Sequence, residues 1–230
     1  MKIGIIGAMD VEVKELIESM DSIKTETTSG ITYYDGKLQG KNVVVAKCGV
    51  GKVHAAVCAQ TMILKYAPDA ILNTGVAGSL NSDLDIADIV ISDNVVQHDM
   101  DTSGLGDPVG LISGVNLISI PCSESLVEKI VKSARTLEKT NVAVGTIASG
   151  DQFICNKDKK DYIVKHFNAL CAEMEGAAIG HVCYLNNVDF CIIRAISDKA
   201  DGSAHMDFPA FTLIAAKKST ELINNFLKTL

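Results

Sequence analysis

Apolar residues along the chain follow two patterns, short apolar runs and longer stretches with helical spacing. The short runs predict strands at 3–8, 31–38, 42–47, 70–74, 88–96, 142–148, 169–174 and 188–196, with a short strand-like piece at 117–121. The helical spacing predicts helices at 10–20, from 52 to about 66, 123–138, 157–167, from after 174 to about 186, and 208–227. Strands that alternate with helices in this way predict an α/β fold, with a mostly parallel or mixed sheet covered on both faces.

The run at 169–174 stands out because it leads into a helix with two carboxylates one residue apart. Glu173 and Glu175 fall where a buried strand should end and a helix begin. Carboxylates are rarely buried without a partner or a task, and ligands of open α/β sheets bind at the carboxyl ends of strands. A simpler interpretation puts one Glu in solvent and the other at the start of the helix, where it complements the helix dipole.

Several other predicted strands also end in small or reactive residues. These residues are Ala8, Met9 and Glu12; Gly75, Val76, Ala77 and Gly78; Ser149, Phe153 and Ile154; and Arg194, Ser197 and Asp198. If the strands run parallel, their ends share one rim of the sheet. Arg194 lies in an apolar strand and so needs a carboxylate or a ligand as its partner. A rim with acids, one Arg and an aromatic ring, but no activated nucleophile, favours acid-assisted hydrolysis or transfer at a sugar carbon.

Composition narrows the class of protein. The chain has 230 residues, 47% of them hydrophobic, which predicts a single α/β domain spanning 1–230. A formal charge of −7 with scattered basic residues disfavours nucleic-acid binding. No apolar run reaches the length of a membrane span, and the first residues lack the pattern of a signal peptide. The seven cysteines, odd in number and without CxxC spacing, predict reduced thiols in a cytoplasmic protein.

Three motifs resemble cofactor or ligand sites but lack the required spacing. Residues 4–7 do not have the dinucleotide-binding fingerprint, and residues 49–52 are not a Walker A loop. The turn at 49–52 is either a tight packing turn or an anion cradle. His98, Asp99 and Asp101 have no second ligand group at a matching spacing, so we predict no metal site. A Gly-rich loop begins with these three residues and spans 98–114, ending at Gly114. A loop of this length is usually functional or contacts a partner.

Segments spread along the chain resemble the bacterial 5′-methylthioadenosine/S-adenosylhomocysteine nucleosidases, which belong to the nucleoside phosphorylase superfamily. They are MKIGIIGAMD followed by Glu12, GVGKVH at 49–54, NTGVAGS at 73–79, SGDQFIC at 149–155, EMEGAAIG at 173–180 and RAISDK at 194–199. The combination runs through nearly the whole chain in the order typical of the family. The resemblance implies a nucleoside phosphorylase-like, three-layer α/β/α sandwich with a central mixed β-sheet, a homodimer, and no cofactor or metal.

The resemblance also implies an activity, which is hydrolysis of the N-glycosidic bond of methylthioadenosine, S-adenosylhomocysteine and 5′-deoxyadenosine in methionine salvage. Asp198, oriented by Ser197, would protonate adenine N7. Glu12, helped by Arg194 and Glu175, would activate the attacking water. An ionised Glu175 would stabilise the ribosyl cation by its field.

The resemblance further implies a set of residues that bind the substrate: Met9, Val50, Val76, Ala77, Gly78, Phe153, Ile154, Glu173, Met174, Ser197 and Phe208. Glu175 and the Met174 backbone would hold the ribose hydroxyls. Phe153 would stack on adenine, while the Ile154 backbone reads its Watson–Crick edge. The 5′-thio pocket would be lined by Met9, Val50 and Phe208.

Two positions depart from the family pattern. Val76 stands where many relatives have Ser, and Leu105 stands where relatives often offer an aromatic ring to the neighbouring subunit's thio pocket. The loop 98–114 is expected to reach that pocket. These departures affect the preference among 5′-substituents and leave the acids unchanged.

Other functions stay open at the level of sequence. A phosphorylase of the same superfamily would use phosphate in place of water, but no cluster of basic phosphate ligands is evident. A nucleosidase acting on aminodeoxyfutalosine is not separated by these motifs. A nucleoside sensor without turnover would lack one of the acids Glu12, Glu175 or Asp198, and a nicotinamide oxidoreductase would need the missing fingerprint.

Overall fold

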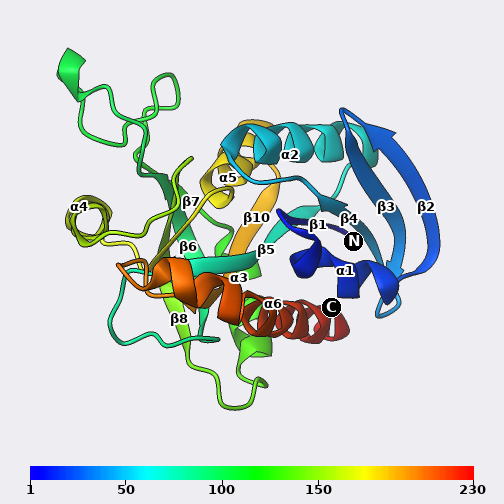
Figure 1. Cartoon of the computed structure of the whole chain (residues 1–230). Coiled ribbons are helices and arrows are strands. Elements are labelled where there is room, and N and C mark those ends of the chain that lie inside the picture. Colours follow the sequence, from blue (N-terminus) through cyan, green and yellow to red (C-terminus); the bar gives the residue numbers. More distant parts are fainter.

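The computed structural model describes residues 1–230 and consists of a central mixed β-sheet between two layers of helices (Figure 1). The elements in chain order are β1 (Lys2–Gly7), α1 (Asp10–Glu18), β2 (Asp21–Thr28), β3 (Ile31–Leu38), β4 (Lys41–Lys47), α2 (Lys52–Tyr66), β5 (Ala70–Ser79), β6 (Ile89–Gln97), the 3-10 helix η1 (Ser103–Leu105), β7 (Ser119–Pro121), α3 (Glu124–Ala134), β8 (Val142–Ser149), α4 (Lys157–Phe167), β9 (Cys171–Glu173), α5 (Gly176–Asn186), β10 (Asp189–Asp198) and α6 (Ala204–Thr229).

The two layers of helices bury separate faces of the sheet. Helices α1, α3 and α6 pack on one face, where Leu16, Ile130 and Phe226 are fully buried against the strands. Helices α2 and α5 cover the other face with side chains that include Met62 and Ile179. This arrangement confirms the predicted sandwich with a mixed sheet. No helix combines the length and the apolar character that a membrane crossing requires.

The 10-stranded sheet is open on one side and closed on the other. Nine strands follow the order β10-β6-β8-β9-β5-β1-β4-β3-β2, and the tenth, β7, pairs with β6 outside this path. Strand β10 also pairs with β5. Strands β10, β6, β8, β9 and β5 therefore form a closed ring. Within it β10 and β5 are parallel, as are β6, β8 and β9, but the two groups run in opposite directions.

The condition for a shared rim, that all these strands run parallel, is therefore not met. Strand β9 pairs antiparallel with the last residues of β5, so that Gly78 faces Ala172 and Ser79 faces Cys171. Strand β9 thus runs in the direction opposite to β5 and ends at Glu173. On the other side of β9, Ser149 of β8 pairs with Glu173. The closed ring, and not a common strand direction, brings these ends together.

Several predicted boundaries also differ from the structure. Gly75 and Gly78 lie inside β5, and Asp198 is the last residue of β10, because both strands continue to the closed ring. Helix α6 begins before Phe208 and contains Pro209, whereas α3 ends before its predicted end. Strand β2 is exposed along nearly its whole length, so its sequence DSIKTETT carries no apolar alternation that would have predicted it.

Candidate active site

A cavity of about 260 Å³ lies where the strand ring meets the starts of α1, α5 and α6. It is lined by Ala8, Met9, Glu12, Val50, Val76, Ala77, Gly78, Phe153, Glu173, Met174, Glu175, Ser197, Asp198 and Phe208. Two larger hollows lie elsewhere, about 430 Å³ beside α1 and β3 and about 490 Å³ beside α5 and β7. The smaller cavity is the one that combines buried carboxylates with apolar walls, which is typical of a binding site.

The structure places all but two of the predicted site residues in the lining of this cavity. Arg194 lies behind the carboxylates with 1% of its surface exposed. The side chain of Ile154 packs into a separate apolar cluster, so that only its backbone remains for recognition. Ala8 completes the lining. The sequence placed it among the small residues at strand ends, but gave it no binding role because its side chain has no functional group.

Glu12 is held by backbone N–H groups from the turn between β1 and α1 and from strand β5. Its Oε2 accepts hydrogen bonds from Ala8 N at 2.7 Å and Met9 N at 2.9 Å, and its Oε1 accepts one from Val76 N at 3.0 Å. A Cβ at Gly75 would overlap Oε1, which explains a glycine at this point of β5. Burial raises the pKa of Glu12, against the charge of Arg194 and the N–H groups, which lower it.

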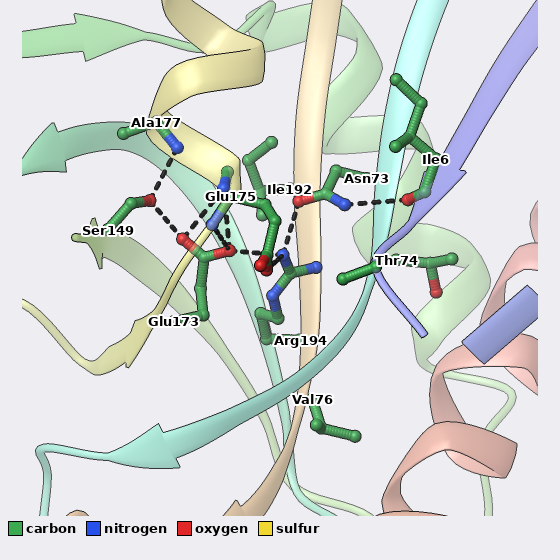
Figure 2. Close-up of polar contacts among 12 residues, drawn as sticks. Ile6, Asn73, Thr74, Val76, Ser149, Glu173, Glu175, Ala177, Ile192 and Arg194 are labelled. Carbon is green, nitrogen blue, oxygen red and sulfur yellow. Dashed lines mark hydrogen bonds and ion pairs between the residues drawn. The ribbon is translucent and has the colours of Figure 1, made fainter. Parts of the chain in front are cut away.

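Arg194 has the carboxylate partners that its burial requires, as Figure 2 shows. Its Nη2 donates to the Glu173 carboxylate and, at 2.5 Å, to Oδ1 of Asn73. The same nitrogen lies 3.6 Å from Oε2 of Glu175. Asn73 is oriented in turn by donating to the carbonyl oxygen of Ile6 at 2.8 Å. The guanidinium is therefore fixed between two strands and both glutamates of the EME segment.

Glu173, the last residue of β9, both anchors Arg194 and accepts hydrogen bonds from the backbone at the start of helix α5. Its carboxylate accepts from the Ser149 hydroxyl and from the backbone nitrogens of Glu175 at 3.0 Å and Gly176 at 2.8 Å (Figure 2). Carboxylates at this end of a helix satisfy otherwise unpaired N–H groups. The interpretation that put one of the two glutamates in solvent is wrong, because Glu173 and Glu175 are 7% and 6% exposed.

Glu175 lies in the lining with fewer fixed bonds than Glu173. Its Oε1 accepts from Gly51 N at 2.9 Å, and its Oε2 is the oxygen near Arg194. Burial and the nearby Glu173 carboxylate raise the pKa of Glu175 to about 8. At this pKa the free carboxyl of Glu175 is mostly protonated at neutral pH. Because Glu12, Glu173 and Glu175 share the single guanidinium of Arg194, a positive charge that develops in the cavity favours the ionised form of Glu175 and is stabilised by it.

Asp198, the last residue of β10, is an acidic group of the lining separate from the glutamates around Arg194. Its Oδ2 accepts from the Ser197 hydroxyl at 2.9 Å, and its Oδ1 accepts from Ala200 N at 2.9 Å. A Cβ at Gly78 would lie 2.7 Å from Oδ1, so this glycine leaves space for the carboxyl. Burial raises the pKa of Asp198, and the nearby Asp207 and Asp201 add to the effect. The side chain therefore keeps a proton at higher pH than an exposed Asp.

Two aromatic rings form an apolar part of the lining. The rings of Phe153 and Phe208 lie 5.5 Å apart in an edge-to-face arrangement. Phe153 is 46% exposed and Val50 is 50% exposed, so both offer free apolar surface at the opening of the cavity. An exposed aromatic face is suited to stacking on a flat heterocycle.

Comparison with known proteins assigns the whole chain to a family. The model of the family described as the phosphorylase superfamily matches residues 2–228. The chain belongs to the phosphorylase superfamily. Among curated members of the family, a protein from Shewanella sediminis named 5′-methylthioadenosine/S-adenosylhomocysteine nucleosidase is 41% identical over 231 residues, which cover 100% of each chain. The resemblance drawn from the sequence motifs is confirmed.

Solved structures of this superfamily agree closely with the fold. The 5′-methylthioadenosine/S-adenosylhomocysteine nucleosidase of Neisseria meningitidis, in complex with methylthio-immucillin-A, has a TM-score of 0.96 and 36% identity, covering 100% of this chain and 99% of that chain. The futalosine hydrolase of Helicobacter pylori has a TM-score of 0.95 and 36% identity, covering 100% and 98%. The predicted nucleoside phosphorylase-like fold is thus confirmed by structures as well as by sequence.

Proposed function

We propose that this protein hydrolyses the N-glycosidic bond of 5′-methylthioadenosine and S-adenosylhomocysteine, releasing adenine and a thioribose product for methionine salvage. One observation carries the proposal: a single buried cavity is lined by Glu12, Glu175 and Asp198 together with the ring of Phe153. Relatives that carry the nucleosidase name cover the full length of the chain. The protein is therefore an N-glycosyl hydrolase, and residues 1–230 act as one domain, with β1 inside the sheet and α6 packed on it.

Departure of adenine is assisted by Asp198. Adenine leaves more readily once its N7 carries a proton, and an acid in this role must be protonated beforehand. The raised pKa of Asp198 supports this role, and the Ser197 hydroxyl orients the carboxyl. Phe153 stacks on the base, and the backbone of Ile154 reads its edge.

Attack by water depends on Glu12. Its Oε1 accepts a single backbone bond and so keeps a lone pair for a water molecule. Arg194 holds the neighbouring glutamates in place, while Glu175 stabilises the ribosyl cation and, with the Met174 backbone, holds the ribose hydroxyls. No part of this scheme requires a metal or an organic cofactor.

The 5′-substituent occupies the apolar part of the cavity. Met9, Val50 and Phe208 line it, and Val76, Ala77 and Gly78 contribute the small residues of β5 that allow close approach. Val76 contributes its backbone N–H to Glu12, so its departure from Ser removes a hydroxyl without disturbing that bond.

Water is favoured over phosphate as the attacking group. None of the residues that line the cavity is Lys, Arg or His. Arg194 lies behind the lining and is engaged by Glu173, Asn73 and the nearby Glu175. A phosphate dianion would enter a site whose nearest charged groups are carboxylates, which is unfavourable.

A second candidate substrate, aminodeoxyfutalosine, is kept because the similar Helicobacter pylori structure is named a futalosine hydrolase.

The activity is tested by an adenine-release assay on methylthioadenosine, S-adenosylhomocysteine and aminodeoxyfutalosine, each with and without phosphate. We expect adenine from the two thioadenosines at a rate that phosphate does not change. Release that depends on phosphate and yields the 5-thio-substituted ribose 1-phosphate would identify a phosphorylase instead. Turnover of aminodeoxyfutalosine alone would transfer the proposal to that substrate.

We further propose that two copies of the chain associate through the face formed by α2, α5 and the loop 98–114. The loop projects from the body of the molecule (Figure 1), and Leu105 at its tip is 86% exposed. Val53 and Leu64 on α2 and Leu185 on α5 are 73%, 74% and 62% exposed. Since α2 and α5 pack against each other, their exposed apolar side chains provide surface for such an interface. In this dimer the loop reaches the opening of the partner's cavity.

The dimer is tested by measuring molecular mass in solution. Light scattering is expected to give twice the chain mass of 24.4 kDa. The Leu64→Asp variant places a charge on the exposed face of α2 without disturbing the core, and its mass should fall to that of one chain. A wild-type mass of 24.4 kDa at assay concentration would contradict the proposal.

A further inference from the structure

Three polar residues outside the cavity form a closed cycle of hydrogen bonds, which we call the polar cycle: Lys52, Asp99 and Asp151. Lys52 Nζ donates to Asp99 Oδ1 at 2.6 Å, and the backbone nitrogen of Asp151 donates to Asp99 Oδ2 at 2.8 Å. The cycle closes where the backbone nitrogen of Lys52 donates to Asp151 Oδ1 at 2.8 Å. It joins the start of α2, the start of the loop 98–114 and the segment after β8. None of the three residues lines the cavity.

The ion pair in the polar cycle is more buried than most ion pairs of this protein. The side chains of Lys52 and Asp99 are 19% and 16% exposed, whereas those of Lys47 and Asp10 are 46% and 80% exposed. Lys52 is further held by Gln97 Oε1 at 3.2 Å. Lysine and backbone hydrogen bonds lower the pKa of Asp99 despite its partial burial. Partly buried pairs with additional hydrogen bonds hold geometry better than exposed ones.

The polar cycle is directly connected to both halves of the proposed active site. Gly51, which precedes Lys52, donates its N–H to Oε1 of Glu175 at 2.9 Å. Its backbone φ of +100° suits glycine, and a Cβ there would lie 3.0 Å from Asp151 Oδ1. On the other side, Phe153 follows Asp151 by two residues, and Gly150 is tied to β9 by its N–H to the carbonyl oxygen of Glu173 at 3.1 Å.

We propose that the polar cycle is a positioning device that sets the ribose-binding carboxylate and the base-stacking ring relative to each other. Lys52 and Asp99 are its positioning residues, and neither touches the substrate. The inference rests on the proposed nucleosidase function and deepens it. Because Glu175 and Phe153 are attached to one cycle, opening it at the ion pair loosens sugar contacts and base contacts together.

The test is the Lys52→Met variant, which keeps the backbone bond to Asp151 and the apolar stem but removes the ion pair. We expect kcat for methylthioadenosine to fall on the order of tenfold, as a displaced catalytic contact does. The inhibition constant of adenine, which reports base binding alone, should rise in parallel. Lys52→Arg should restore most of both values because it can pair with Asp99 again.

A double-mutant cycle separates positioning from general loss of stability. Asp99→Asn keeps an acceptor for the Asp151 N–H, so it remains folded even if Lys52→Met is poorly stable. The double variant should be no worse than the more affected single variant, because both remove the same link. Lys47→Met, which breaks the exposed pair with Asp10, is the matched control and should leave kcat and adenine inhibition unchanged.

The outcomes distinguish this inference from the proposed function. An active wild type whose Lys52→Met and Asp99→Asn variants show lower thermal stability but unchanged kcat and adenine inhibition overturns the positioning role. Additive losses in the double variant also overturn it. A wild type that releases no adenine at all overturns the proposed function, and the inference falls with it.

Discussion

Replacement of Asp198 by Asn is expected to leave the fold intact and to lower kcat about 10²- to 10⁴-fold, the usual contribution of a general acid. An Asn at this position keeps an oxygen to accept from Ala200 N, so the turn after β10 is preserved. It has no proton to give to adenine N7. The measurement is adenine release at saturating substrate, with circular dichroism to confirm folding. A near-normal kcat would refute the acid role.

The pH dependence provides a second readout of the same group. The acid must be protonated, so activity that depends on Asp198 is present below its pKa and lost as the pH rises through it. Burial and the neighbouring Asp207 and Asp201 raise that pKa above the ordinary 3.8, which extends activity toward neutral pH. The residual rate of Asp198→Asn should lack this decline. Gly78→Ala, whose Cβ would crowd Oδ1, should give a smaller loss of kcat.

The Glu12→Gln variant is expected to abolish hydrolysis while it still binds an inhibitor such as methylthio-immucillin-A, the ligand in the similar Neisseria meningitidis structure. An amide does not accept the proton of the attacking water. Both carboxylate oxygens of Glu12 accept backbone N–H groups, so either orientation of the Gln amide points its NH₂ at a donor. That mismatch should also cost about 1–3 kcal/mol of stability. Adenine release, inhibitor binding and thermal unfolding measured together separate the two effects.

A second pair of variants isolates the placement of Glu12 from its chemistry. Gly75→Ala keeps the carboxylate but puts a methyl group against it, so we expect partial loss of kcat with inhibitor binding retained. Gly202→Ala is the matched control because Gly202 lies outside the cavity lining and the loop 98–114, and a Cβ there meets nothing within 4 Å. If Glu12→Gln turned over substrate normally, water would have to be activated by a different group.

The elements that the sequence predicted well are those whose burial follows a simple period. The predicted helix at 157–167 coincides with α4, whose start is fixed by the Asn156 side chain accepting from Lys159 N. The predicted strand at 31–38 coincides with β3, in which buried Ile31 and Tyr33 alternate with less buried neighbours. Strand β2 was not predicted because it is an exposed edge strand, so its sequence has no alternation of apolar and polar residues.

The candidate site was predicted from residue chemistry and from position after strands. Acids in apolar surroundings are costly unless they have a partner or a task, which drew attention to the acids at the strand ends. The separate roles of Glu12, Glu175 and Asp198 came from the family resemblance. The partners themselves were not predictable. The family resemblance assigned Arg194 to help Glu12, yet the short contacts of Arg194 are with Glu173 and Asn73. Glu173 lies 21 positions from Arg194 along the chain, and Asn73 lies 121 positions from it.

The sequence by itself predicted the class of fold, because apolar periodicity is a local property, and its motifs indicated the family. It also named Glu12, Glu175 and Asp198 as candidates, which the structure brings to one cavity. Only the tertiary structure decided how the strand ends meet. Pairing of β9 with β5, and of β10 with both β5 and β6, closes part of the sheet into a ring. That closure brings oppositely directed strands to one cavity and aims Gly51 N–H at Glu175. Such contacts depend on pairing between distant segments, which no local pattern records.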